Sequence, residues 1–334
     1  MRGFLRFITP LLLFIGVGIG IMDLAPSSSA VVRPNAESNP FSQESVRAAE
    51  ARVERTGCAP RSPGASVPLG IGRVGGTSIA LVGTCVDGHG PFPFVVDTGS
   101  SVSVIARSLA RQINLAQSAA ELPVATVGCS VKVGLASLHR LSLSGLVVAP
   151  QTVLVAAMGN LSGVDGLIGS DLLSRQGSAT IDYTGASLSL GAHGVGASID
   201  INVVRQALPG ALAGQSAVVA IAHVGFGRMS LPLVVDSGAA RLTLRSAVAS
   251  SLGLRSQGST LLQGIGCSIR AQEYRVNHWS IGGRAMDAIA ANGAELPDVA
   301  EAKGLLGSNV LAAHGEFTID YRNQRLYLDD PKAR

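Results

Sequence analysis

The stretch FVVDTGSS at residues 94–101 recurs as LVVDSGAA at residues 233–240. Each copy begins with apolar, mainly β-branched residues, which are typical of a buried strand. Burying a carboxylate at the end of such a strand is energetically unfavourable unless the carboxylate is hydrogen-bonded. The glycine that follows lets backbone N–H groups approach it closely. Asp97 and Asp236 are therefore a candidate pair of carboxyl groups for acid–base activation of a water molecule.

The residues around the two aspartates also repeat, in the same order. The aspartates are 139 residues apart, and three further landmarks each recur at an offset of 138 residues. These are GCSV at 128–131 with GCSI at 266–269, GLIGS at 166–170 with GLLGS at 304–308, and ATIDY at 179–183 with FTIDY at 317–321. A repeat of this length indicates two homologous lobes, which we place at residues 67–195 and 196–334.

Both lobes show the pattern of an all-β fold. Many short apolar runs separated by glycine-containing turns predict six- to eight-stranded, β-barrel-like lobes. Two strands are expected before each aspartate and a short helix after it: strands 79–86, 92–96, 217–223 and 230–235, and helices 107–114 and 246–252.

Composition and spacing exclude several classes of function. The 334 residues are 47% hydrophobic and 14% charged, with a net charge of +4 and no basic run interleaved with aromatics, so we expect no nucleic-acid partner. The G-x-G-x-x-G match at residues 70–75 is followed by a predicted strand rather than a helix, which argues against dinucleotide binding. The six histidines have no metal-ligand spacing, so we expect neither a metal nor another cofactor.

The N-terminus has the features of an export segment. Two arginines precede an apolar run at residues 7–22, and small residues follow it. This pattern fits either a signal peptide within residues 1–30 or an uncleaved membrane anchor, and we favour the anchor because no clean Ala-x-Ala site is present. Either interpretation places the remainder of the chain outside the cytoplasmic membrane. We interpret residues 31–66 as a spacer, or alternatively a removable prosegment, with one helix at residues 42–55.

These motifs together resemble the aspartic proteases of the pepsin and retropepsin superfamily, in a single-chain, two-lobe form. The resemblance rests on D-T-G-S and D-S-G-A, each followed by an apolar-apolar-glycine element at residues 167–169 and 305–307. It implies an acid protease fold with the active site in a cleft between the lobes. It also implies an endopeptidase with Asp97 and Asp236 as the catalytic dyad and a peptide or protein substrate bound extended, most simply in a monomer.

The resemblance also assigns roles to the residues beside the dyad. Thr98 and Ser237 are expected to form hydrogen bonds across the lobe interface, and Gly99 and Gly238 to present backbone N–H groups to the carboxylates. Ser100 occupies a position whose hydroxyl donates to the aspartate in this family, whereas its counterpart Ala239 cannot. The sequence therefore predicts an asymmetric dyad that works in mildly acidic rather than strongly acidic solution.

The same resemblance places Gly128–Cys129 and Gly266–Cys267 near the tips of two flaps that cover the cleft. Four cysteines allow three pairings in an exported chain. Because the flap tips should approach each other, we favour Cys129–Cys267, which leaves Cys58–Cys85. Two unpaired, space-filling thiols at the flap positions are the alternative.

Other repeated or distinctive residues are interpreted as structural. Asp182 and Asp320 lie in the repeated T-I-D-Y element and are interpreted as turn residues, and Trp279 as part of the second lobe's core. Two alternatives to an enzyme are kept: a non-catalytic peptide-binding protein that uses the same cleft, and a structural envelope protein.

Overall fold

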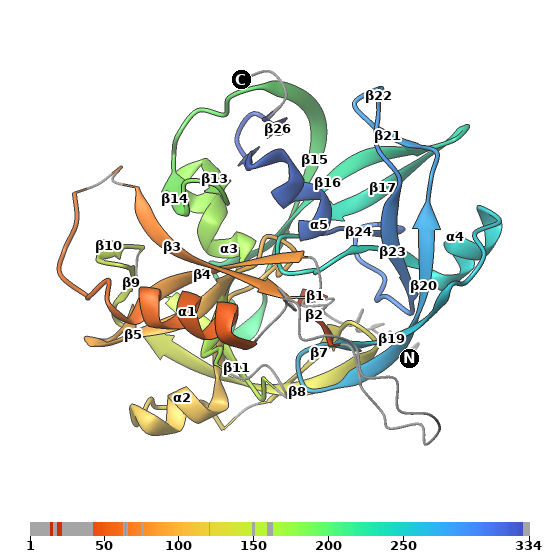
Figure 1. The fold of residues 1–334 in the computed structure, drawn as a ribbon. Helices are drawn as coiled ribbons and strands as arrows, with labels where there is room; N and C mark the ends of the chain where they lie inside the picture. The colour runs from red at the N-terminus through yellow and green to blue at the C-terminus, as the bar shows by residue number, and fades with distance from the viewer. Residues whose placement is uncertain are drawn as a thin grey trace, which may run out of the picture.

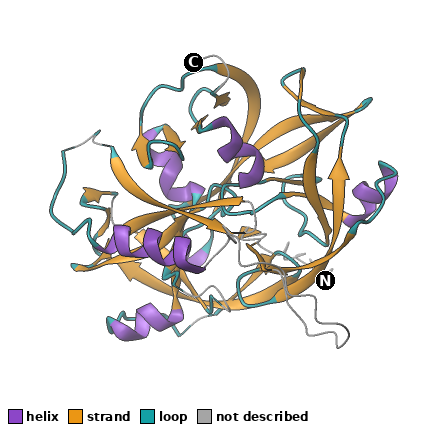
Figure 2. Cartoon of the chain, viewed as in Figure 1, coloured by secondary structure: helices purple, strands orange, loops and turns teal. Residues whose placement is uncertain are grey.

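The computed structural model describes residues 14–15, 19–21, 43–62, 64, 66–74, 77–119, 121–148, 151–158 and 163–329. Strands dominate this part of the chain, and the helices are short and lie mainly at its periphery (Figure 2). The fold is therefore all-β with two lobes, as predicted.

The first lobe is preceded by three elements, β1 (Phe14–Ile15), β2 (Ile19–Ile21) and α1 (Gln43–Glu54). It then contains β3 (Val67–Val74), β4 (Thr77–Val86), β5 (His89–Val96), β6 (Val104–Ala106), α2 (Arg107–Gln112), β7 (Leu122–Thr126), β8 (Cys129–Leu138), β9 (Leu141–Leu143), β10 (Leu146–Val147), β11 (Gln151–Ala156), β12 (Gly166–Ile168), α3 (Ser170–Leu173), β13 (Ser178–Asp182) and β14 (Ser187–Leu190).

The second lobe repeats this order. It contains β15 (Ala197–Ala207), β16 (Ser216–Phe226), β17 (Met229–Val235), β18 (Leu242–Arg245), α4 (Ser246–Ser251), β19 (Gly258–Gln263), β20 (Ser268–Val276), β21 (Trp279–Ile281), β22 (Arg284–Ala285), β23 (Ile289–Ala294), β24 (Gly304–Leu306), α5 (Ser308–Leu311), β25 (Glu316–Asp320) and β26 (Arg325–Leu328). The predicted strands before each aspartate and the helices after it are present, as β4, β5, β16, β17, α2 and α4.

An antiparallel sheet joins the two lobes. Its strands run in the order β3, β14, β13, β25, β26, β15, so the two copies of the T-I-D-Y element pair at its centre. Thr180 lies opposite Thr318, and their hydroxyls are 2.8 Å apart. Because these positions are equivalent, an approximate two-fold axis passes between them and relates one lobe to the other.

Each aspartate is positioned by a parallel strand pair. In the first lobe, β5 pairs with β12, with Val96 opposite Ile168, and the Asp97 N–H donates to the Ile168 carbonyl at 2.9 Å. In the second lobe, β17 pairs with β24 in the same register, and the Asp236 N–H donates to Leu306 at 3.0 Å. The repeated G-L-[IL]-G-S motif therefore forms the neighbouring strand that holds the end of each aspartate-bearing strand in position.

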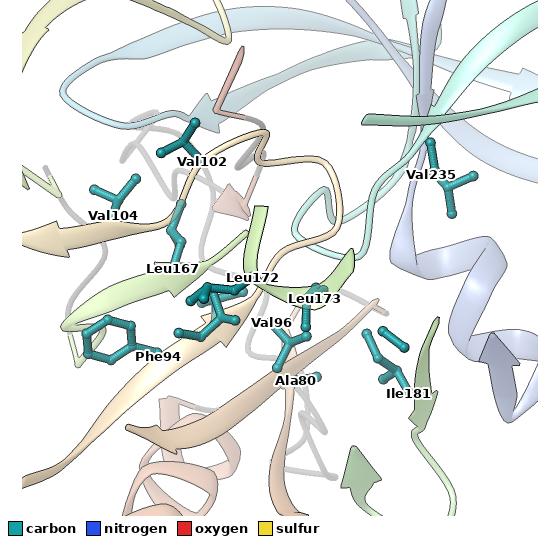
Figure 3. Close-up of a cluster of buried hydrophobic side chains, with 14 of the residues drawn as sticks. Ala80, Phe94, Val96, Val102, Val104, Leu167, Leu172, Leu173, Ile181 and Val235 are labelled. Atoms are coloured by element: carbon teal, nitrogen blue, oxygen red, sulfur yellow. The ribbon is translucent and has the colours of Figure 1, made fainter. Parts of the chain in front are cut away.

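A close-packed core supports the first aspartate. Side chains from β5, β6, β12 and α3 gather in one buried cluster, among them Phe94, Val104, Leu167 and Leu172 (Figure 3). A Cβ at Gly166 would lie 2.2 Å from the Phe94 ring, so glycine is needed where β12 crosses it. Burial of these apolar side chains stabilises the loop.

Residues 43–62 are part of the first lobe rather than a free spacer. Helix α1 packs on β3, with Ala49 and Val53 buried, and a Cβ at Gly70 would lie 2.2 Å from the Ala49 carbonyl oxygen. The G-x-G-x-x-G match therefore begins in a strand that carries a helix on its surface, and it forms no strand–turn–helix unit. The boundary at residue 67 cuts through this packing.

Candidate active site

Asp97 and Asp236 lie at the lobe interface, each at the end of its strand and each fully buried. The Asp97 carboxyl accepts hydrogen bonds from the backbone N–H groups of Gly99 and Ser100, at 3.0 and 2.9 Å. The Asp236 carboxyl accepts the equivalent bonds from Gly238 and Ala239, at the same two distances. In both aspartates these bonds use Oδ1, whereas no N–H or hydroxyl donor in the described part of the chain reaches Oδ2.

The glycine after each hydroxyl residue lies against the opposite carboxyl group. A Cβ on Gly99 would lie 2.2 Å from Asp236 Cγ, and a Cβ on Gly238 would lie 2.5 Å from Asp97 Cγ. Both distances are shorter than any real contact of a methyl group. The glycines therefore allow the two carboxyls to come together, in addition to presenting their backbone N–H groups.

Four crossed hydrogen bonds hold the two loops together. The Thr98 hydroxyl donates to the Val235 carbonyl at 2.8 Å and accepts from the Ser237 N–H at 3.0 Å. In the equivalent arrangement, the Ser237 hydroxyl donates to Val96 at 2.7 Å and accepts from the Thr98 N–H at 3.0 Å. All four bonds are buried and cross between lobes, so they fix the position of one aspartate relative to the other.

Both carboxyl groups have raised pKa values. Burial raises the pKa of Asp97 well above its ordinary value, and the negative charge of Asp236 raises it further. Burial also raises the pKa of Asp236, and hydrogen bonds with the Ala239 N–H, the Asp97 carboxyl and the Gly238 N–H offset part of that effect. Two carboxyls in one desolvated site share a proton, because ionising both would place like charges side by side.

The expected role of the Ser100 hydroxyl is wrong. Its Oγ donates to the carbonyl of Val102 at 2.8 Å and makes no hydrogen bond to Asp97. The buried hydroxyl is satisfied there, because the carbonyl two residues further along the same loop lies within hydrogen-bond distance. Each aspartate receives two backbone hydrogen bonds of the same kind, so the difference between Ser100 and Ala239 gives neither carboxyl an additional hydroxyl hydrogen bond.

The structure adds residues that the sequence did not single out. Ser170 Oγ donates to the Thr98 carbonyl and lies 2.8 Å from the hydroxyl of Tyr321, which comes from the other lobe. Nearby, the Ser103 hydroxyl donates to Asp171 at 2.7 Å and accepts from the Gly169 N–H at 2.9 Å. The recurrence of G-L-[IL]-G-S and T-I-D-Y in the sequence indicated that these segments matter. It did not predict that they contact the loop that carries the dyad.

The hairpins at the two predicted flap positions are β7–β8, called the first flap here, and β19–β20, called the second flap. Val127 at the tip of the first flap is buried against second-lobe residues that include Leu262 and Ile269. Gly128 has a φ of +80°, and a Cβ there would lie 2.2 Å from the Ile269 side chain. The flap tips of the two lobes are therefore in direct contact.

The cysteines form two disulfide bonds. Cys129 pairs with Cys267 and joins the two flap tips, and Cys58 pairs with Cys85 and ties the segment after α1 to β4. This is the favoured pairing, so the alternative of unpaired thiols is wrong. Disulfide bonds are typical of proteins in an oxidising compartment.

The residues interpreted as structural have structural roles. The Asp182 and Asp320 carboxyls accept hydrogen bonds from backbone N–H groups of the turns that follow them. Trp279 is buried, and its indole N–H donates to the backbone carbonyl of Asp287.

Apart from the strands β1 and β2, the predicted signal or anchor segment lies outside the described residues. Within those residues, no helix has the length and apolar character needed to cross a membrane.

Comparison with known proteins agrees with the geometry. The sequence model of the aspartyl protease family matches residues 82–172 and 219–310, one match in each lobe and together more than half of the chain. Each match spans an aspartate loop, a flap and the G-L-[IL]-G-S strand. No curated protein matched the chain. Two repeats of one family, two aspartate loops joined across an interface and a buried carboxyl pair lead to one conclusion: this chain belongs to the aspartyl protease family.

Proposed function

We propose that this protein is an aspartic endopeptidase in which Asp97 and Asp236 activate a water molecule to hydrolyse a peptide bond. The observation that carries the proposal is the pair of buried carboxyls, held by crossed hydrogen bonds, whose Oδ2 atoms accept no hydrogen bond from an N–H or hydroxyl group of the described chain. The two turn aspartates differ from this pair: Asp320 bonds through both oxygens, and Asp182 bonds through Oδ1 alone but is not buried.

The shared proton divides the chemical work between the two carboxyls. The ionised aspartate removes a proton from the water, whose oxygen attacks the peptide carbonyl carbon. The protonated aspartate donates a hydrogen bond to the carbonyl oxygen and stabilises the charge that develops there. When the C–N bond breaks, the leaving nitrogen takes a proton from the dyad. One proton shared by two aspartates is the arrangement by which aspartic proteases in general supply both an acid and a base.

The substrate is an extended peptide that adds to the flaps as a strand. Backbone hydrogen bonds to a strand edge bind peptides of many sequences, and side-chain pockets then select among them. The disulfides favour an oxidising location, and we place the catalytic lobes outside the cytoplasmic membrane. The N-terminal segment directs export as a signal peptide or anchors the protein as a membrane span.

In this proposal, access of a peptide to the dyad depends on whether the disulfide between the flaps is oxidised or reduced. Both aspartates have 0% exposure, so peptide reaches them only when covering chain moves. Replacing Cys129 and Cys267 by serine should raise kcat/KM for long peptides, because the flaps can then separate. Replacing Cys58 and Cys85 in the same way is the matched control and should leave flap amide exchange unchanged. Identical flap exchange in both double variants would contradict the idea.

A peptide-cleavage assay tests the main proposal. Purified protein should cleave a peptide library in a pepstatin-sensitive manner, and Asp97→Asn should lower kcat/KM at least about 10³-fold. Asp200→Asn is the matched control, because that carboxylate is exposed and only pairs with Arg325. Peptide binding without cleavage by the wild-type protein would favour a non-catalytic peptide-binding protein. Neither binding nor cleavage would favour a structural envelope protein.

A further inference from the structure

A cavity of about 630 Å³ lies where the two lobes meet, and neither dyad aspartate lines it. Its walls come from β8, β11 and α3 of the first lobe and from β15 and β16 of the second lobe. Helix α3 contacts β16 across the lobe boundary in this region (Figure 1). We call this space the junction cavity, and the residues that give it its chemistry are Gln151, Asp171, Arg175, Arg205 and Gln215.

Three residues of the junction cavity have buried polar atoms without hydrogen-bond partners. Gln151 is 7% exposed, and neither atom of its side-chain amide has a partner in the described part of the chain. Asp171 is 4% exposed; its Oδ1 accepts from the Ser103 hydroxyl at 2.7 Å, whereas no N–H or hydroxyl donor of the described residues reaches its Oδ2. The Oε1 atom of Gln215, from the second lobe, is unpaired in the same sense. Because buried polar atoms normally have partners, these side chains offer an amide donor and three acceptor oxygens to a ligand.

The second lobe closes the equivalent position with its own side chain. The repeat offset of 138 residues matches Asp171 with Asn309 and Gln151 with Ile289, and the strand register of β8 with β11 equals that of β20 with β23 at this offset. Asn309 uses both ends of its amide: Oδ1 accepts from the first N–H of β18 at 2.8 Å, and Nδ2 donates to a carbonyl of β23 at 2.9 Å. An ionised carboxylate cannot donate to a carbonyl, so Asp171 cannot make the second bond. The unpaired polar atoms are therefore particular to the first lobe.

Two arginines give the mouth of the junction cavity a positive charge. Arg175 follows α3 in the first lobe, Arg205 comes from β15 of the second lobe, and both are exposed. The Arg205 guanidinium donates to the Ser174 hydroxyl at 3.2 Å, which holds it against the first lobe. The position equivalent to Arg175 is Ala313, so this charge too is particular to the first lobe. Since the side chains with unpaired atoms are largely buried and the arginines are exposed, the positive charge lies outside the unpaired atoms.

We propose that the junction cavity binds the C-terminal end of a peptide, with the carboxylate at the arginines. A guanidinium suits a carboxylate because its fork of N–H donors faces both oxygens. The N–H and C=O groups that precede a C-terminal carboxylate match the deeper acceptor oxygens and the Gln151 amide donor. A simple inorganic anion has no N–H donor for those oxygens. The volume lies within the range of pockets that hold small ligands. The choice of a peptide rests on the proposed endopeptidase function, whose products carry such ends.

Isothermal titration calorimetry tests the site without catalysis, in the full chain carrying Asp97→Asn. Triglycine should bind, and triglycinamide, which lacks the carboxylate, should bind at least about tenfold more weakly. Inorganic phosphate should also bind more weakly than triglycine, because it leaves the deeper acceptor oxygens without N–H donors. Equal affinity for triglycine and triglycinamide, phosphate binding as tight as that of triglycine, or no binding of triglycine overturns the proposal.

Variants of the cavity residues place the binding. Arg175→Gln combined with Arg205→Gln removes both charges and should weaken triglycine binding at least about tenfold. Arg140→Gln combined with Arg228→Gln is the matched control, because these two arginines are exposed and do not line the cavity. Gln151→Ile, which copies the second lobe at this position, should also weaken binding because it removes the deeper amide. Unchanged triglycine affinity in both cavity variants overturns the proposal.

Turnover by the active full chain identifies the source of the carboxylate. If the site holds the substrate's own C-terminus, triglycine should raise KM for a fluorogenic peptide, and the Arg175→Gln and Arg205→Gln double variant should abolish that rise. An unchanged KM identifies a separate peptide, such as a product, as the occupant. Triglycine binding without turnover by the wild-type protein rejects the endopeptidase function and leaves the site standing.

Discussion

Replacing Thr98 by valine isolates the crossed hydrogen bonds that join the lobes. Valine has nearly the same shape as threonine but no hydroxyl, so Thr98→Val leaves the Val235 carbonyl and the Ser237 N–H without their cross-lobe partner. Thr98 is fully buried, so water cannot replace the lost bonds without opening the interface. A buried group left unpaired costs about 1–3 kcal/mol, so the free energy of unfolding should fall by about 2–6 kcal/mol.

Two variants calibrate this loss. Thr98→Ser keeps the hydroxyl and removes one methyl group, which should cost only about 1 kcal/mol. Thr84→Val is the matched control, because Thr84 is equally buried but its hydroxyl reaches only the Val82 carbonyl, at 3.5 Å. The free energy of unfolding of each of the three variants is measured by guanidinium unfolding followed by circular dichroism. All variants carry Asp97→Asn to prevent self-digestion. A Thr98→Val loss within about 1 kcal/mol of the Thr84→Val loss would refute the reasoning.

Three further outcomes follow from the site. Gly99→Ala should lower kcat/KM at least about a hundredfold, because its Cβ would lie 2.2 Å from Asp236 Cγ. Gly134→Ala is the control and should be active, because the atom nearest to its Cβ would lie 3.4 Å away. Wild-type activity in Gly99→Ala would contradict the geometry. Burial raises the pKa of both dyad carboxyls in the folded protein. The dyad's contribution to stability is therefore complete below the unfolded-state pKa of about 3.9 and is lost as pH rises through the folded-state pKa values. Asp236→Asn should consequently have a higher Tm than wild type at pH 7 and a similar Tm at pH 3. A Tm difference independent of pH would count against this. For the same reason the kcat/KM profile should peak in mildly acidic buffer, and a maximum below about pH 3 would be inconsistent with the buried dyad.

The sequence predicted much of the site because duplication repeats its signals. One D-[TS]-G pattern is an ordinary turn, but two copies with matching downstream motifs indicate two lobes and one dyad. The flap disulfide was also predicted, since equivalent residues near a two-fold axis approach each other. The local sequence pattern was sufficient to predict the strands before each aspartate, because short apolar runs of β-branched residues seldom form anything other than buried strands.

Other features depend on contacts that no local pattern encodes. The Ser100 hydroxyl donates to Val102 in its own loop, so the predicted hydrogen bond from Ser100 to Asp97 does not form. The contact between Ser170 and Tyr321 joins residues 151 positions apart, and only lobe docking brings them together. The sequence by itself determined the repeat, the two carboxyls and the all-β fold, because these follow from residue type and spacing. Tertiary structure alone decided the hydrogen-bond partners, the raised pKa values and the contact between the flap tips, because each depends on which distant groups share a buried interface.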